Sequence, residues 1–258
     1  MALEQYCKKL RQCQKPLQRS ESMPSVILLN EVDSTNLYAL RNIHKLENLS
    51  VIFAEYQSAG KGRENRNWFS PKGNIYASFV LKEFKYPPPC AAFATCLAGL
   101  FTLRSLAPSI NLSIKLPNDI VCENRKIGGV LCEFRKVQNK DIIVAGIGLN
   151  INSSEDELKN IPANAVSIYS ITKEKNDLEF VRISLINNAY RFFSMSDDEI
   201  VSNFVKNCIM SGREVVVKDY QFHIKGKLNE ILKDGAAIIE TPDGKIRKFY
   251  SGDFSSDS

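Results

Sequence analysis

Histidine is scarce in this 258-residue sequence, with only His44 and His223. A Ser-His-Asp hydrolase needs an imidazole at a defined position, so such a site has very few ways to be built here. Any catalysis is therefore expected to rely on lysine, arginine, carboxylates and backbone amides. The signatures GxxxxGK[ST] and GxGxxG are also missing, which excludes a Walker P-loop and a Rossmann fingerprint. A nucleotide, if one binds, would be held by a loop and a sheet surface.

Cysteine gives no metal or disulfide signature. The sequence has seven cysteines, and none of them forms a CxxC pair. An odd number without such pairs indicates neither a zinc site nor the disulfide framework of a secreted protein. Reduced thiols are the simplest interpretation, and they predict a cytoplasmic protein.

Long apolar stretches are missing as well. The longest run, Cys90–Leu103, is shorter than the roughly 20 residues that cross a bilayer, and it predicts a buried helix. The basic residues near the start are not followed by an apolar segment. We therefore expect no signal peptide and no association with a membrane.

The composition is that of a globular protein. Hydrophobic residues make up 44% of the chain and charged residues 24%, which rules out a disordered or fibrous chain. The length fits one large domain or two unequal ones. A net charge of +5 is too small to indicate nucleic-acid binding by itself.

The order of apolar segments predicts an α+β fold with a small β domain behind it. We expect an N-terminal arm over 1–22, a catalytic domain over 23–210 and a small β domain over 211–258. The last segment has Lys-Asp-Gly and Pro-Asp-Gly turns and the size of an SH3-like barrel. The predicted strands of the larger domain are 24–32, 51–56, 75–81, 112–116, 120–123, 127–135 and 141–151. The predicted helices are 34–45, 90–106, 177–193 and 197–208.

A basic glycine-containing segment, 57–74, connects two of these strands. Gly60 and Gly62 allow the backbone to approach a ligand closely. Three cations within six positions can neutralise phosphate or carboxylate oxygens, and Trp68 can supply an apolar wall for a ring. A solvated basic loop is an equally good interpretation of this segment alone.

Three further segments carry polar or small residues at strand ends. In Lys115-Leu-Pro-Asn118-Asp119, a plain turn is the simpler interpretation, although Asp119 could hold an incoming amine. In Lys126-Ile-Gly-Gly-Val-Leu-Cys-Glu, paired glycines indicate a bulge or the close approach of a ligand, with an ammonium beside them. In the segment 146–152, GIGLNIN, small and amide side chains share one strand face and could form the wall of a polar site.

Taken together and in this order, the segments resemble the biotin–protein ligases. The family's GRGRxGRxW followed by SPxGN corresponds to GKGRENRNWFSPKGN at 60–74, and its KWPND to KLPND at 115–119. Its KxGGxLxE lies at 126–133, its GxGxNxN at 146–152 and its early DSTN at 33–36. The resemblance covers about residues 24–254, nearly the whole chain.

The resemblance implies a biotin/lipoate ligase-like catalytic fold followed by the SH3-like domain. It also implies that the biotin carboxylate attacks the α-phosphate of ATP, giving biotinyl-5′-AMP and pyrophosphate, and that a lysine of a carrier protein then displaces AMP. The expected partner is a biotin carboxyl carrier domain of acetyl-CoA carboxylase or another biotin-dependent carboxylase. Mg²⁺ is expected on the ATP phosphates, without a protein cage of its own.

The same resemblance implies roles for individual residues. The expected biotin-binding residues are Ser34, Thr35, Asn36, Gln57, Lys61, Gly62, Arg63, Lys126, Gly128 and Gly129. The expected ATP- or adenylate-binding residues are Lys61, Arg63, Arg66, Trp68, Asn118, Lys126 and Asn150. The expected catalytic residues are Lys126, Arg63 and Asp119.

Three positions depart from the family pattern, namely Lys61 for arginine, Asn65 for glycine and Leu116 for tryptophan. None removes a charge that the mechanism needs, so we expect activity. A winged helix does not fit before the first strand, so we expect no specific DNA binding and no repressor role. The oligomeric state, monomer or homodimer, stays open.

Two other functions compete with this interpretation. A lipoyl or octanoyl ligase or transferase would have a related catalytic fold, but the Ser34-Thr35-Asn36 cluster favours a ureido ring. A non-enzymatic nucleic-acid-binding module would use the basic loop and the β domain. The sparse aromatics of that loop and the modest net charge argue against it.

Overall fold

The larger part of the molecule is built on a seven-stranded sheet. The computed structural model describes residues 24–159, 161, 164–219 and 222–256. The strand order is β1-β2-β3-β7-β6-β5-β4; β1 and β2 are parallel and all other neighbours antiparallel. The strands are β1 (Val26–Val32), β2 (Val51–Gln57), β3 (Ile75–Leu81), β4 (Leu112–Lys115), β5 (Asp119–Cys122), β6 (Arg125–Val137) and β7 (Lys140–Leu149).

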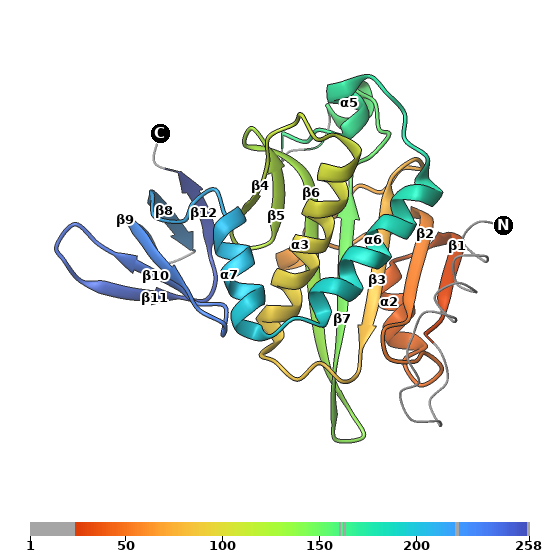
Figure 1. Cartoon of the computed structure of the whole chain (residues 1–258), viewed down its shortest axis with the longest axis horizontal. Coiled ribbons are helices and arrows are strands. Elements are labelled where there is room, and N and C mark those ends of the chain that lie inside the picture. Colours follow the sequence, from red (N-terminus) through yellow and green to blue (C-terminus); the bar gives the residue numbers. More distant parts are fainter. Residues whose placement is uncertain (1–23, 160, 162–163, 220–221, 257–258) are drawn as a thin grey trace.

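Helices cover the two faces of this sheet unequally. Figure 1 shows α3 (Pro88–Leu106), α6 (Leu178–Phe193) and α7 (Asp197–Asn207) together on one face. The opposite face is covered by α2 (Thr35–Arg41), which packs Ala39 against Ile52 and Val144. Because α2 is only seven residues long, part of this face is left for a pocket.

Helix α3 is the core of the larger unit, as the apolar run at Cys90–Leu103 predicts. Prolines at its first positions suit a helix start, where no intrahelical amide donor is needed. It is the one helix in the described ranges that is long and apolar enough to cross a membrane, yet 67% of it is buried between the sheet, α6 and α7. The helix is therefore explained by packing inside the protein.

A second, antiparallel sheet follows α7. Its strand order is β11-β10-β9-β8-β12, as expected for a small SH3-like domain. The strands are β8 (Glu214–Asp219), β9 (Phe222–Ile231), β10 (Ala237–Glu240), β11 (Ile246–Phe249) and β12 (Asp253–Ser256). The Lys233 ammonium pairs with Asp197 of α7, and the backbone amide of Ile209 donates to Ile114 of β4. These contacts hold the second sheet beside the first, at the left in Figure 1.

The α+β class and both sheets confirm the sequence prediction, but several details differ. The first helix ends at Arg41 and not near 45, and the strand predicted over 141–151 ends at Leu149. Two short helices, α4 (Glu155–Leu158) and α5 (Ile168–Thr172), lie in segments predicted without helix. Both begin with a capping box, and the sequence pattern Ser154-x-x-Glu157 is typical of such a helix start.

Short polar pairs form two tight turns of the first sheet. Glu123 and Asn124 connect β5 to β6, and Gln138 and Asn139 connect β6 to β7, all four with positive φ. Two-residue loops of this kind match the twist of antiparallel strands. The predicted arm over 1–22 lies outside the described residues, and the boundary at 210 remains a proposal.

Candidate active site

A pocket of about 830 Å³ lies on the α2 side of the first sheet. All but one of the site residues predicted from the sequence line it, although they come from separate segments of the chain. The lining includes Ser34, Thr35, Asn36, Gln57, Lys61, Gly62, Arg63, Arg66, Trp68, Asn118, Asp119, Lys126, Gly129 and Asn150. The exception is Gly128, where an added Cβ would meet Leu149 and Ile120 of the core.

The start of α2 forms a polar end of the pocket. Thr35 and Asn36 are each only 4% exposed, and the Thr35 amide donates to Gln57 Oε1 at 2.8 Å. Ser34 is the N-cap, but its side chain makes no capping bond, which leaves that hydroxyl for a ligand. Next to it, the Arg41 guanidinium holds the pKa of Asp33 at about 2, so Asp33 is a carboxylate tied to the surface of α2.

Glycines on β6 and β7 make room for two of the lining side chains. A Cβ at Gly146 would lie 2.3 Å from Asn36 Oδ1, and a Cβ at Gly148 would lie 2.4 Å from the Trp68 ring. A Cβ at Gly129 would also meet Trp68, at 3.0 Å. The alternation of strand side chains puts Gly146 and Gly148 on one face, as the sequence predicts. The glycines therefore allow Asn36 and Trp68 to lie directly on the sheet.

The basic loop between β2 and β3 folds back on itself. Lys61 bridges Asn67 in antiparallel fashion, and the Gly62 amide donates to the Arg66 carbonyl. Glu64 and Asn65, at the tip, both have positive φ. Asparagine tolerates this conformation better than most residues, which explains why Asn65 can stand where the family pattern has glycine.

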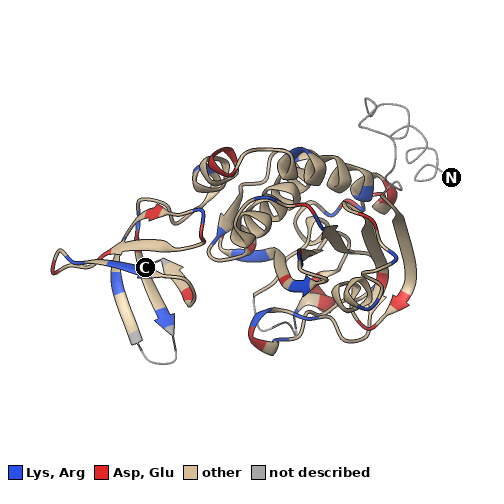
Figure 2. Ribbon diagram, turned by 90° about the horizontal axis from the view of Figure 1, so that it is seen from below, with Lys and Arg blue, Asp and Glu red and all other residues tan. Residues whose placement is uncertain are grey.

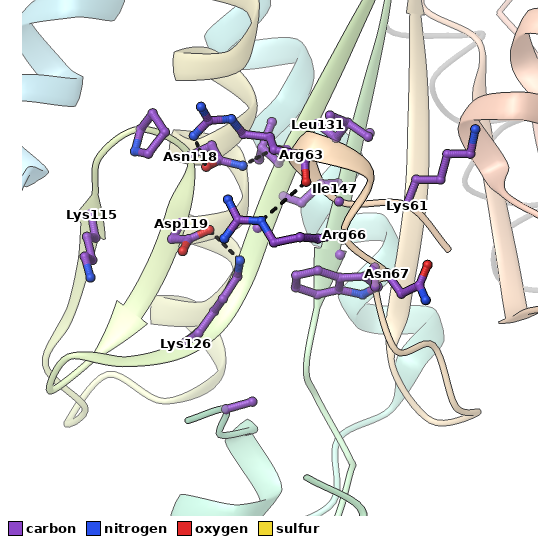
Figure 3. A pocket seen from close by; sticks show the side chains of 18 of the residues that line it. Lys61, Arg63, Arg66, Asn67, Lys115, Asn118, Asp119, Lys126, Leu131 and Ile147 are labelled. Carbon is purple, nitrogen blue, oxygen red and sulfur yellow. Dashed lines mark hydrogen bonds and ion pairs between the residues drawn. The ribbon is translucent and has the colours of Figure 1, made fainter. Parts of the chain in front are cut away.

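The cations of the loop do not all point the same way. Figure 3 shows Arg63 and Arg66 near Asn118 and Asp119, whereas the Lys61 side chain extends away from that group. Arg63 donates to Asn118 Oδ1 at 3.4 Å, and Asn118 in turn donates to the Val130 carbonyl. The turn at 117–119 is thus a positioning element as well as a turn.

Lys126 lies at the centre of the pocket's charges. Its Nζ is 2.6 Å from Asp119 Oδ1 and 5.2 Å from the centre of the Trp68 ring. Both charged side chains are about three-quarters buried, which strengthens their attraction. This short contact is an ion pair, so Asp119 Oδ1 faces the Lys126 ammonium.

Two buried side-chain atoms in the described ranges have no hydrogen-bond partner, and both belong to this pocket: Trp68 Nε1 and Asp119 Oδ1. Native proteins leave few such atoms, and each one calls for an explanation. The Lys126 ammonium compensates Asp119 Oδ1, so Trp68 Nε1 is the atom whose missing partner a polar ligand would supply.

Positive charge dominates the lining. The cations are Lys61, Arg63, Arg66, Lys115, Lys126 and Lys218, and the carboxylates are Asp119 and Asp253. This excess suits an anion with several charges, such as a polyphosphate. Within the described residues no group of three or more His, Cys, Asp and Glu side chains could hold a metal ion.

The second sheet contributes residues that sequence reasoning missed. Lys218 of β8 and Asp253, Phe254 and Ser255 of β12 line the same pocket. Asp253 accepts from Arg66 at 3.5 Å, across 187 positions of sequence. No motif marks these residues, because only the docking of the second sheet brings them to the site.

Two expectations about the fourth motif are only partly met. Asn150 is 5% exposed and donates to the Val166 carbonyl, so its amide group also positions the backbone on the far side of the pocket. Asn152 lies outside the pocket and donates to the Asn176 carbonyl. Leu116 of the second motif, where the family pattern has tryptophan, is 5% exposed; it packs into the core and also lines the pocket.

Comparison with known proteins places the chain among enzymes of one kind. The sequence model described as "Biotin/lipoate A/B protein ligase family" matches residues 28–150. The bifunctional ligase/repressor BirA of Escherichia coli is 30% identical over 245 residues, covering 90% of this chain and 74% of that protein. The biotin–[acetyl-CoA-carboxylase] ligase of Paracoccus denitrificans is 33% identical over 134 residues, covering 50% of this chain and 55% of that protein.

A solved structure agrees over almost the full length. The biotin protein ligase from Aquifex aeolicus in complex with biotin and ATP superposes with a TM-score of 0.75 and 29% identity. The match covers 90% of this chain and 98% of that one. The similarity therefore extends over most of both sheets.

Proposed function

This chain belongs to the biotin–protein ligase family, and from that premise we propose how its pocket carries out the ATP-dependent attachment of biotin to a protein lysine. The enzyme is a ligase that uses biotin and ATP. The observation that carries the residue roles is the Lys126–Asp119 ion pair beside the Trp68 ring, in a pocket whose other charges are mostly cationic. Such a pocket combines a hydrogen-bond donor, a carboxylate acceptor and a positive electrostatic potential that attracts anions.

The polar end of the pocket receives the biotin head. The Ser34 hydroxyl, the Thr35 hydroxyl and the Gln57 amide line it, and they are the kinds of group that satisfy a ureido ring. The valeryl chain then leads past the Asn36 and Trp68 side chains, which lie directly on Gly146 and Gly148. The carboxylate of biotin is thereby directed toward Lys126.

The first half-reaction joins two anions, so its barrier falls when positive charge is fixed at the meeting point. The biotin carboxylate attacks the α-phosphate of ATP, the bond to the pyrophosphate leaving group breaks, and biotinyl-5′-AMP forms. We assign Lys126 to the shared charge of carboxylate and α-phosphate, because it is the most central of the lining cations. Arg63 and Arg66 face the phosphates, and preorganised cations of this kind stabilise the charge that develops.

Trp68 provides the wall on which the nucleotide is oriented. Its ring lies on Gly129 and Gly148, and its Nε1 lacks a partner until a ligand oxygen or nitrogen arrives. Asn150 is assigned to the adenylate side, where it supports the Val166 carbonyl. Mg²⁺ is expected to enter with the ATP phosphates.

The second half-reaction needs an acceptor amine at the same carbonyl carbon. We assign Asp119 to this step, because its carboxylate lines the pocket beside Lys126. The carboxylate holds the incoming lysine, the amine attacks the mixed anhydride, and AMP leaves as the amide forms. The proton released by the amine passes to Asp119 or to solvent.

The protein partner is proposed from the relatives. The name of the Paracoccus denitrificans enzyme specifies acetyl-CoA carboxylase. We propose that this chain likewise modifies a biotin carboxyl carrier domain. The expectations of a cytoplasmic location, of a monomer or homodimer and of no specific DNA binding stay predictions.

The alternative functions have less support. Lipoate carries a dithiolane ring without N–H groups, and it would leave the polar groups around Thr35 without partners. For nucleic acid, Figure 2 shows Lys and Arg interspersed with Asp and Glu over both sheets and not gathered on one face. A continuous basic surface is what such a module needs.

Pyrophosphate release from ATP and magnesium tests this function. The protein is given biotin, and separately lipoate or octanoate. Release that requires biotin is the expected result. Release with lipoate alone, or no release from folded protein with any of the three acids, would contradict the proposal.

A further inference from the structure

A chain of buried hydrogen bonds runs behind the polar end of the pocket. It links Thr35 through Ser78 to Asn36, and Asn36 to Glu133; we call these four residues the relay. Thr35 and Asn36 line the pocket, whereas Ser78 of β3 is fully buried behind them. Neither Ser78 nor Glu133 lines the cavity, so any effect on a ligand passes through Thr35 or Asn36.

The amide of Asn36 is fixed in one orientation. Its Nδ2 donates to the Leu131 carbonyl and to the Glu133 carboxylate, both at 3.1 Å. Neither partner has a proton to give, so the amide nitrogen must face them. The oxygen, Oδ1, consequently faces Ser78, with the two oxygens 2.5 Å apart.

This orientation decides where the hydroxyl protons go. Ser78 Oγ lies 2.5 Å from Asn36 Oδ1 and 2.8 Å from Thr35 Oγ1, but a serine has one proton. Because Asn36 Oδ1 has no proton, Ser78 must donate to it. The Ser78–Thr35 contact is then made by the Thr35 proton.

The Thr35 hydroxyl oxygen therefore has only lone pairs to offer a ligand. Its proton is directed inward, to Ser78 at 2.8 Å in preference to Gln57 Oε1 at 3.2 Å. Toward the cavity Thr35 Oγ1 can only accept. A ligand atom placed there must be a donor, such as the N–H of a ureido ring.

We propose that Ser78 and Glu133 are positioning residues that fix Thr35 as a hydrogen-bond acceptor, and so select a ring that presents an N–H. This inference rests on the proposed function and deepens it, because it names the residues that set head-group specificity. Glu133 orients the Asn36 amide, Asn36 Oδ1 accepts a hydrogen bond from Ser78, and Ser78 Oγ accepts a hydrogen bond from Thr35. The selection is made by residues that do not touch the substrate.

The test uses biotin and two analogues in which one or the other ureido N–H is replaced by oxygen, which turns a donor into an acceptor without adding bulk. Dissociation constants are measured by calorimetry on the full chain. The unaltered protein is expected to prefer biotin by about a hundredfold over at least one analogue, since a donor has been lost against an acceptor-only oxygen.

Ser78→Ala removes the nearer of the two inward acceptors of the Thr35 proton, which leaves only the longer contact with Gln57 Oε1 and allows the hydroxyl to turn and donate more often. We expect biotin to bind roughly tenfold more weakly and the preference over that analogue to fall at least tenfold. The control is Ser50→Ala, which removes another fully buried serine whose hydroxyl accepts from Ser25 and Glu47 away from the pocket. It should leave the preference unchanged.

A second pair of variants keeps the inference testable if Ser78→Ala does not fold. Glu133→Gln keeps an acceptor for Asn36, and Glu133→Leu does not. We expect Glu133→Leu to raise the KM for biotin without lowering kcat at saturating biotin, and Glu133→Gln to stay near the unaltered enzyme.

The outcomes distinguish a failure of the proposed function from a failure of the relay. If the unaltered protein binds no biotin, the proposed function fails, and the relay with it. If it binds biotin but Ser78→Ala weakens biotin and both analogues equally, or the two Glu133 variants behave alike, the relay alone is overturned.

Discussion

Gly148→Ala offers a sharp test of how the pocket is built. Gly148 of β7 lies directly under the Trp68 ring, and its φ is not in the left-handed region that would exclude alanine. In a strand, replacing glycine by alanine normally stabilises by roughly 0.5–1 kcal/mol. A loss of stability here would therefore report the contact with Trp68.

The geometry sets the magnitude. An added Cβ would lie 2.4 Å from Trp68 Cε2 and 2.6 Å from Cζ2 and Nε1, whereas carbon atoms normally approach to about 3.5–4.0 Å. The ring must move by about 1 Å. Overpacking of this kind typically costs about 1–3 kcal/mol. A displaced ring also shifts the wall opposite Lys126, and a misplacement of about 1 Å can lower the rate about a hundredfold.

Two measurements check this prediction, urea unfolding for stability and biotin-dependent pyrophosphate release for activity. Gly128→Ala is the matched control, because its Cβ would meet Leu149 at 2.8 Å and the Gly148 carbonyl oxygen at 3.2 Å, on the core side and away from Trp68. That variant should lose stability with much less effect on activity. In a Trp68→Ala background, Gly148→Ala should cause little further loss. Unchanged activity and stability of Gly148→Ala, or equal losses with and without Trp68, would refute the reasoning.

Four further changes have expected outcomes. Lys126→Ala should lower adenylate formation by about 10²–10³-fold in folded protein, and near-normal pyrophosphate release would exclude its role. Arg63→Gly should loosen retention of the adenylate and raise biotin labelling of bystander proteins, measured by streptavidin blot; unchanged labelling contradicts it. Since the pKa of Asp33 falls from 3.8 to about 2 beside Arg41, the pair's stabilisation is present above pH 3.8 and lost as pH falls toward 2. In urea unfolding at several pH values, Asp33→Asn should remove this pH dependence of the free energy of unfolding. The effect should be small, because the pair is exposed. Burial raises the pKa of Cys132 to about 12, so iodoacetamide at pH 8 should label it only slowly in native protein, as followed by mass spectrometry.

The sequence located the elements and the chemistry well where the signals are local. Apolar runs marked the buried strands and α3, and short polar pairs such as Glu123-Asn124 marked turns. The paired glycines predicted an irregular strand, and the pairing of β5 with β6 shifts register there. The same pattern did not separate the two glycines, because Gly129 faces the pocket and Gly128 the core.

Long-range contacts were beyond such reasoning. The Ser78–Asn36 bond spans 42 positions and the Asn36–Glu133 bond spans 97, and a predicted ligand-binding Asn36 proved to have its amide nitrogen committed to protein partners. No local pattern predicts which strand will lie beside which, because register and strand order follow from how whole faces are buried.

The residue types of this chain, taken alone, determined its chemistry: few histidines, clustered cations, glycines at strand ends and a single tryptophan. These features act through intrinsic charge and backbone freedom, which do not depend on the rest of the fold. Tertiary structure decided which of these groups face one cavity. It placed Asp253 beside Arg66, left Trp68 Nε1 without a hydrogen-bond partner, and directed the Thr35 proton inward, since burial and packing act only once distant segments meet.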